Sequence, residues 1–188
     1  MNIQNERKPH MSISQLTDYL QCPYAYYLHH VAGIAWKSTP PAVAFGACIH
    51  RTIATMNTNI RCGDRIDRDS VVGQFSNQWG DEIQRNNIHW SKPEEPATLL
   101  IKGEELMDLY WRKFRRHHYD EVELGFRLPI LDTTTGMYVP QRDVVGRLDA
   151  VSDNSLVEYK TSGRTPNPGI TRIGVDLYAN GSTPQLRG

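Results

Sequence analysis

Hydrophobic residues recur at helical spacing through most of the first 118 residues. Ser12 and Gln15 have the spacing of a capping box, which predicts that a helix begins there, and Pro23 is typical of the first turn of a second helix. Residues 1–11 are polar and are expected to be irregular. The same periodicity predicts three longer helices, at 45–57, 70–85 and 99–118.

After residue 118 hydrophobic positions alternate with polar ones, as they do in β-strands. We expect strands at 121–131, 137–151 and 155–161. Helices followed by strands favour an α+β fold, or a sheet with a helical N-terminal part. Residues 163–188 are rich in Pro and Gly, so we expect no core helix there.

The segment VVGRLDAVSDNSLVEYKTS predicts a β-hairpin with a two-residue Asp-Asn turn at 153–154, because both residue types tolerate the left-handed conformation. This register sets Asp149 directly opposite Glu158, and Arg147 opposite Lys160. Since side chains alternate between the two faces of a strand, these four charged residues share one face. The other face receives a core-like set, formed by Val144, Gly146, Leu148, Ala150, Val157 and Tyr159.

Two directly opposed carboxylates repel each other unless a cation lies between them. Carboxylate oxygens suit Mg²⁺ or Mn²⁺ better than Zn²⁺, which prefers His and Cys. Lys160 projects to the same face as Glu158 and can reach a water molecule on such a metal. Together these groups supply what hydrolysis of a phosphodiester needs, which is a Lewis acid, an activated water and a cation for the developing charge.

A salt-bridge ladder is the alternative for this charged face. Its pairs would be Arg147–Glu158 and Asp149–Lys160, on the diagonals of the hairpin, and mixed charges of this kind usually lie on a solvated surface. Three apolar residues share the face and indicate a partly buried cleft instead, namely Val145, Val151 and Leu156. A slip of one residue in the register would move one carboxylate to the other face.

Composition and charge exclude several classes of protein. The 188 residues carry 21 basic and 21 acidic side chains, so the chain is not a general polycation and any contact with DNA must use a local basic patch. Arg112, Arg115 and Arg116 are candidates for such a patch on a helix, although a solvated helix face explains them equally well. Three cysteines without a CxxC pair argue against a disulfide framework, and no apolar run suits a secretory signal or a membrane span. We therefore expect a cytoplasmic protein that does not enter a membrane.

Three motifs resemble those of one nuclease superfamily. GRLDAV…LVEYKTS resembles the Asp…Glu-x-Lys core of the PD-(D/E)XK nucleases, in the RecB-like branch that includes AddB-type recombination nucleases and CRISPR-adaptation exonucleases. SISQLTDYLQCPYAYYL, at 12–28, is similar to the N-terminal helix motif of that branch. FGACIH, at 45–50, is similar to its Gly-x-x-x-His helix. The three motifs follow one another in the order found in the family.

The resemblance implies a restriction-endonuclease-like α+β core, with a central mixed sheet flanked by helices. We expect a single domain at 1–188, with a mainly helical part at 12–118 and a sheet part at 119–188. The implied activity is Mg²⁺- or Mn²⁺-dependent hydrolysis of DNA, as an exonuclease in recombination, repair or phage replication, with a helicase or recombination subunit as a partner. An inactive or truncated nuclease-like module that binds DNA or a helicase is the alternative.

The resemblance also implies a role for each matching residue. Asp149 and Glu158 would hold the metal, with His50 as a third ligand and the backbone carbonyl of Tyr159 beside them. Lys160 would position or deprotonate the attacking water.

The sequence departs from the family pattern near its C-terminus. In the family, Glu-x-Lys is followed by a helix with a Gln that contacts DNA, and then by a Tyr. Gln185 matches the Gln, but the sequence stops where the Tyr is expected. Some members hold a 4Fe-4S cluster, in which Cys22 would be the first ligand, but no cysteine follows Cys62. We therefore expect a C-terminally shortened or diverged member, and neither a cluster nor an iron–sulfur structural domain is expected in this chain.

Overall fold

The computed structural model describes residues 10–93, 95–153 and 155–160. Among them, 10–35 and 125–147 form one unit, which we call the first unit. The second unit is formed by 36–124 and 148–160. That the whole chain forms a single domain remains a prediction.

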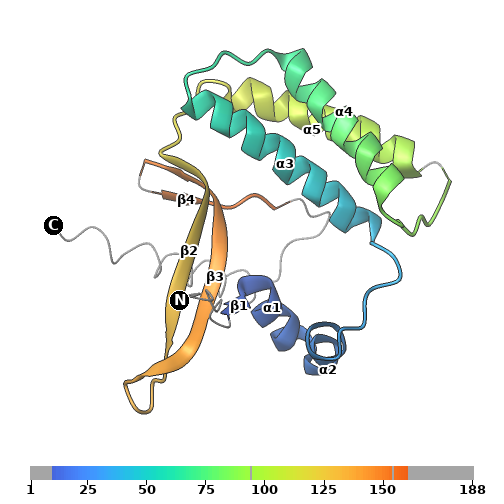
Figure 1. Ribbon diagram of the computed structural model, residues 1–188. Helices are drawn as coiled ribbons and strands as arrows, with labels where there is room; N and C mark the ends of the chain where they lie inside the picture. The colour runs from blue at the N-terminus through green and yellow to red at the C-terminus, as the bar shows by residue number, and fades with distance from the viewer. Residues whose placement is uncertain (1–9, 94, 154, 161–188) are drawn as a thin grey trace, which may run out of the picture. The chain divides into compact units, whose positions relative to one another are not determined.

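Three helices make up most of the second unit, and they lie side by side in Figure 1. They are α3 (Pro41–Arg61), α4 (Arg68–Arg85) and α5 (Glu95–Phe114). All three are predicted by the sequence, but α3 is longer at both ends than 45–57, and α5 begins and ends four residues before 99–118. Proline explains both early starts, because Pro41 and Pro96 lie in the first turn of their helices, where a missing N–H costs nothing. Within the described residues, no helix combines the length and the apolar composition needed to cross a membrane.

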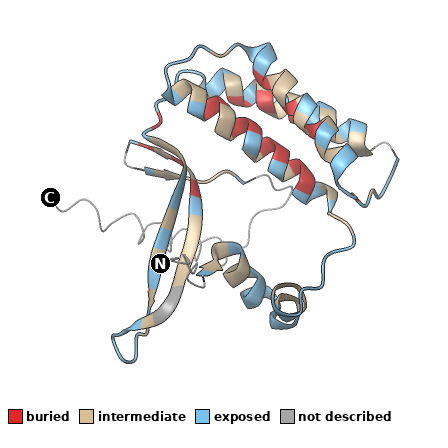
Figure 2. Cartoon of the chain, viewed as in Figure 1, coloured by how far each residue is buried: buried red, intermediate tan, exposed pale blue. Residues whose placement is uncertain are grey.

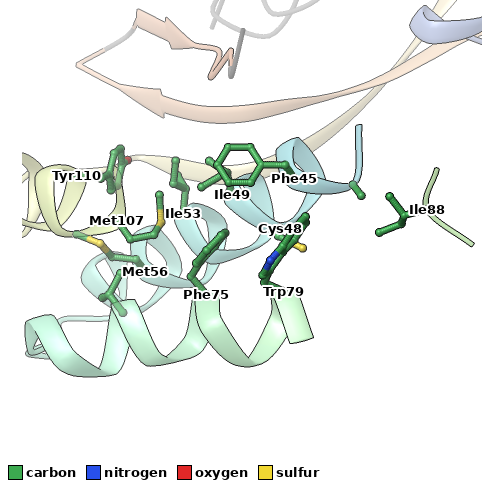
Figure 3. Close-up of a cluster of buried hydrophobic side chains, with 12 residues drawn as sticks. Phe45, Cys48, Ile49, Ile53, Met56, Phe75, Trp79, Ile88, Met107 and Tyr110 are labelled. Carbon is green, nitrogen blue, oxygen red and sulfur yellow. The ribbon is translucent and has the colours of Figure 1, made fainter. Parts of the chain in front are cut away.

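The core of the second unit lies between these helices. Buried residues, red in Figure 2, lie mainly along the sides where the helices meet. Figure 3 shows the side chains that fill this space, among them Phe45, Ile49, Ile53 and Met56 of α3, Phe75 and Trp79 of α4, and Met107 and Tyr110 of α5. Each large apolar side chain gains roughly 1.5–3 kcal/mol on burial. This packing fixes the rotation of α3 about its axis and hence the direction in which His50 projects.

The first unit begins with a short strand and continues through three helical segments. They are β1 (His10–Ser12), α1 (Ile13–Gln21), α2 (Pro23–Tyr26) and the π-helical turn η1 (Tyr27–Val31). The predicted capping box of Ser12 and Gln15 is present, and Pro23 begins α2 as predicted. The expectation that residues up to 11 are irregular is wrong for His10 and Met11, because both pair with a distant strand.

The strands form a mixed sheet. The remaining strands are β2 (Glu121–Leu131), β3 (Tyr138–Ser152) and β4 (Ser155–Val157). The order is β1-β3-β2, with β1 parallel to β3, and β4 pairs with β3 in the antiparallel direction. Each predicted strand is present, although β4 ends earlier than expected. The predicted α+β class is therefore confirmed.

Candidate active site

The hairpin predicted around the Asp-Asn turn is present with the predicted register. Its residue pairs are Ser152–Ser155, Val151–Leu156 and Ala150–Val157. Asp153 has a φ of 48°, the left-handed conformation expected in this turn. The pairing ends at Val157, so the strand pairing predicted for Glu158 and Lys160 is not formed.

The side chain of Asp149 takes the place of the next bond in the ladder. Its Oδ2 accepts a hydrogen bond of 2.8 Å from the backbone N–H of Tyr159. A backbone N–H that is satisfied by a side chain needs no strand partner, which explains why the ladder stops. Leu148 and Ala150, on either side of Asp149, are buried in the core. Asp149 therefore projects from the other face of β3, as the alternation predicts.

His50 of α3 reaches this aspartate. Its Nδ1 lies 3.4 Å from Oδ1 of Asp149, and the two side chains are only 30% and 15% exposed. The structure thus brings the histidine of one predicted motif into contact with the aspartate of another.

Glu158 and Lys160 pair with each other, because Nζ of Lys160 contacts Oε1 of Glu158. The second carboxylate oxygen, Oε2 of Glu158, is buried and has no hydrogen-bond partner among the described residues. Buried polar atoms nearly always have a partner. A bound cation would satisfy such a carboxylate oxygen, which lacks a hydrogen bond and belongs to an acid beside a second acid.

The ionisation of these groups reflects their contacts. The hydrogen bond with Asp149 raises the pKa of His50 above its ordinary value, against the opposing effect of burial. Burial alone would raise the pKa of Asp149, but hydrogen bonds from His50 and from the N–H of Tyr159 hold it below its usual range. Burial raises the pKa of Glu158, and the contact with Lys160 only partly offsets this. At neutral pH the surroundings therefore stabilise the ionised form of Asp149 and destabilise the ionised form of Glu158.

The observed pairs differ from those of the salt-bridge ladder. That ladder requires Asp149 to pair with Lys160, whereas Asp149 contacts His50 and Lys160 contacts Glu158. The exchange of partners follows from the early end of β4, which frees residues 158–160 from the register of the hairpin.

The donor atoms of the site suit a hard divalent cation, because carboxylate oxygens and one imidazole nitrogen are ligands that Mg²⁺ and Mn²⁺ accept. Among the described residues, no three His, Cys, Asp or Glu side chains are gathered closely enough to hold a metal. His50 and Asp149 are in contact, but the third predicted ligand, Glu158, is engaged by Lys160 through one oxygen. The Oε2 atom of Glu158, which has no hydrogen-bond partner among the described residues, is a ligand of the kind that such a metal accepts.

The three arginines predicted to contact DNA differ in their surroundings. Arg112 is paired with Asp108, one turn earlier in α5, at 2.6 Å. Arg115 and Arg116 lie beyond the end of α5, which corrects the expectation that they belong to this helix. Arg115 donates a hydrogen bond to the carbonyl oxygen of Arg112, which helps to end the helix, and lies over the ring of Trp111.

A cavity of about 270 Å³ lies beside Lys160. Its wall is mostly apolar and comes largely from α3 and α5, with Ile49, Ile53 and Phe114 among its residues. Lys113, in the last turn of α5, also lines it. The end of α5 therefore brings a second positive charge next to the predicted catalytic lysine.

A buried polar cluster that was not predicted from the sequence lies beside the site. Asn57, Tyr110 and Tyr119 form hydrogen bonds that also include Tyr159. Asn57 lies one turn after Ile53, on the apolar side of α3. A polar residue at such a position needs buried hydrogen-bond partners, so its place in the hydrophobic pattern was the feature that could have predicted the cluster. Burial raises the pKa of Tyr110 and of Tyr119, so both hydroxyls keep their protons.

Two further residues were predicted from the sequence, Cys22 and Gln185. Cys22 is the N-cap of α2, and its Sγ accepts a hydrogen bond of 3.4 Å from the N–H of Ala25. Gln185 lies outside the described residues. The expectation that the chain holds no 4Fe-4S cluster stays a prediction.

Comparison with known proteins gives one match. The model of the PD-(D/E)XK nuclease superfamily matches residues 10–187, nearly the whole chain. The match includes the capped helix α1, the helix that carries His50 and the Asp…Glu-x-Lys hairpin. No curated protein and no solved structure matches the chain. With a restriction-endonuclease-like α+β fold and a match of this extent, the chain belongs to the PD-(D/E)XK nuclease superfamily.

Proposed function

We propose that this chain is a Mg²⁺- or Mn²⁺-dependent DNA nuclease that hydrolyses phosphodiester bonds and acts on DNA ends as an exonuclease. One observation carries the proposal. His50 contacts Asp149 beside Glu158, whose Oε2 is buried and has no partner among the described residues. Membership of the superfamily supports a nuclease, and the donor atoms support a divalent metal.

In this proposal the residues of the site have distinct tasks. His50, Asp149 and Glu158 would hold the metal, together with the backbone carbonyl of Tyr159. When bound, the metal supplies a Lewis acid that polarises the phosphate. Lys160 would position the attacking water or accept its proton, and its contact with Glu158 keeps the amine at the edge of the site.

DNA would approach along the positive charges at the end of α5. Lys113 and Lys160 line the same cavity, and Arg115 and Arg116 are exposed directly after the helix. Because the formal net charge of the chain is zero, a local patch of this kind is what can attract a phosphate backbone.

We also propose that the chain belongs to the RecB-like branch, close to AddB-type nucleases. The support is the order of two helical motifs, the capped helix that ends at Cys22-Pro23 and the helix α3 that carries His50. This branch implies a role in DNA recombination, repair or phage replication, with a helicase or recombination subunit as the partner.

The test is cleavage of end-labelled linear DNA by the purified chain with Mg²⁺, with Mn²⁺ and with chelator. We expect cleavage with either metal and none with chelator. Lys160→Ala should lower the rate by roughly 10²–10⁴-fold, the usual contribution of a general acid or base, while DNA binding changes little. Lys102→Ala, at an exposed position of α5, is the matched control and should cleave at the wild-type rate.

Four results would count against the proposal or a part of it. Cleavage that persists in chelator would exclude the metal, and cleavage by Lys160→Ala at the wild-type rate would remove Lys160 from the mechanism. Binding of DNA without any cleavage would favour the inactive DNA-binding module instead. Cleavage of closed circular DNA at the rate of linear DNA would contradict the exonuclease assignment alone.

A further inference from the structure

Four polar side chains form a hydrogen-bonded cluster at the edge of the second unit's core. Asn57 comes from α3, Tyr110 from α5, and Tyr119 from the segment that joins α5 to β2. The fourth, Tyr159, is the middle residue of the Glu-x-Lys motif. We call these four residues the tyrosine–asparagine cluster.

Asn57 bonds to two tyrosines of the cluster, one through each end of its amide group. Its Nδ2 donates to the hydroxyl of Tyr159 at 3.0 Å, and its Oδ1 accepts from the hydroxyl of Tyr110 at 3.0 Å. The hydroxyl of Tyr110 also lies 2.8 Å from that of Tyr159 and 3.0 Å from that of Tyr119. Since a hydroxyl has one proton and two lone pairs, Tyr110 uses its full capacity with these three partners.

Burial makes this arrangement rigid. Asn57 is fully buried, and Tyr110 and Tyr119 are almost so. Breaking one hydrogen bond would leave a partner unsatisfied away from water, which makes alternative positions of the side chains unfavourable. The cluster therefore allows one position for the hydroxyl of Tyr159.

Tyr159 also contacts the candidate active site directly. Its backbone N–H donates to Oδ2 of Asp149 at 2.8 Å, and its ring meets the imidazole of His50 edge to face, with centroids 6.4 Å apart. Its chain neighbours are Glu158 and Lys160. One residue thus connects the buried cluster to all four proposed functional side chains.

The early end of β4 explains why this connection is needed. The ladder of β3 and β4 stops at Val157, so strand pairing does not hold Glu158 and Lys160 in place. The hydroxyl of Tyr159, anchored in the core, and its N–H, bonded to Asp149, replace the missing strand bonds.

We propose that Tyr159, anchored by Asn57 and Tyr110, is a positioning residue that sets where Glu158 and Lys160 lie relative to Asp149 and His50. The inference rests on the proposed metal-dependent nuclease. Displacements of about 1 Å at an active site cost up to roughly 10²-fold in rate, so a lost anchor should be visible in catalysis.

The test compares two variants of the full chain that each lose one buried hydroxyl. Tyr159→Phe removes the anchor, whereas Thr52→Val removes a buried hydroxyl of α3 that bonds to Cys48 and Gln78, outside the cluster. Rates of DNA cleavage are measured over a series of Mn²⁺ concentrations, well below the unfolding temperature of both variants. We expect Tyr159→Phe to lower kcat about 10-fold or more and to raise the Mn²⁺ concentration for half-maximal rate, with KM for DNA unchanged. Thr52→Val should stay within about twofold of the wild type in kcat, although both variants unfold more easily.

The outcomes separate this inference from the proposed function. An active wild-type chain together with a Tyr159→Phe variant of unchanged kcat and Mn²⁺ dependence would overturn the inference alone. Equal losses in Tyr159→Phe and Thr52→Val would also overturn it, because they would indicate a general effect of stability. A wild-type chain that cleaves no DNA would overturn the proposed function and the inference with it. Should Tyr159→Phe not fold, Tyr110→Phe keeps the bond between Asn57 and Tyr159 and should show an intermediate loss of kcat; no loss would overturn the inference.

Discussion

The contact between His50 and Asp149 determines how the candidate site responds to pH. The hydrogen bond with Asp149 raises the pKa of His50, so the folded protein favours the protonated ring. This pair stabilises the metal-free protein fully below the ordinary pKa of histidine, and the stabilisation is lost as the pH rises through the raised value. We expect Asp149→Asn to return the pKa of His50 toward its ordinary value, as measured from the NMR shifts of the ring protons in chelator. Equal pKa values in the wild type and the variant would show that the two side chains do not interact in solution.

Glu158 is held where its charge is unfavourable. Burial raises its pKa, Asp149 adds to this effect, and Lys160 only partly opposes it. A carboxyl group whose pKa is raised on folding destabilises the protein above that pKa, and the cost disappears as the pH falls. Glu158→Gln should therefore stabilise the metal-free chain by up to about 1 kcal/mol at neutral pH, as functional-site substitutions often do, in urea unfolding with chelator. The salt-bridge ladder predicts the reverse, a loss of stability with metal affinity unchanged.

At the residue scale, the motifs predicted which side chains meet but not how each is held. The alternation of β3 correctly placed Asp149 opposite the core face, and the Gly-x-x-x-His motif correctly brought His50 to it. The register predicted Arg147 opposite Lys160, and this was wrong, because the pairing ends at Val157, where the side chain of Asp149 accepts from the backbone N–H of Tyr159. Lys160 contacts Glu158 instead. A prediction from alternation assumes regular strands, so it does not foresee a hydrogen bond between a side chain and a nearby backbone N–H.

At the element scale, the predicted helices and strands are present and their boundaries account for most of the differences. The helix α5 begins four residues early, because Pro96 lies in its first turn instead of preceding it. It also ends early, which separates Arg115 and Arg116 from the helix. Hydrophobic periodicity identifies the middle of a helix well, but its ends depend on caps and on single hydrogen bonds.

A glycine in α5 allows the close packing of α4 against it. A Cβ at Gly103 would lie 2.0 Å from the ring of Phe75, so the two helices could not keep their present distance. We expect Gly103→Ala to destabilise the protein by about 1–3 kcal/mol, the usual cost of overpacking a core, in urea unfolding. Gly73→Ala is the matched control in α4, where a Cβ meets no atom within 4 Å. That variant should be stabilised by up to about 1 kcal/mol through helix propensity, and equal effects of the two substitutions would contradict the packing described here.

At the scale of the whole molecule, the order of helices followed by strands predicted the α+β class, but the sheet has one strand that no local pattern indicates. His10 and Met11 pair with Asp143 and Val144 of β3, across most of the chain. A three-residue strand has too few positions for an alternation to be recognised. The tertiary structure determines which strand β1 pairs with, and hydrophobic periodicity carries no information about that choice.

We have proposed that Asp149, Glu158 and His50 together bind one divalent metal, and direct measurement of Mn²⁺ binding tests this without reference to catalysis. Isothermal titration calorimetry compares Mn²⁺ binding by the wild-type chain, by Asp149→Asn and by the control Asp153→Asn. The control makes the same change in the turn of the same hairpin, where Asn also tolerates the left-handed conformation. We expect one Mn²⁺ per chain in the wild type and in Asp153→Asn, and at least about tenfold weaker binding in Asp149→Asn, as expected when a carboxylate ligand is lost. Equal Mn²⁺ affinities in Asp149→Asn and Asp153→Asn, or no binding to the wild type, would contradict the proposed metal site.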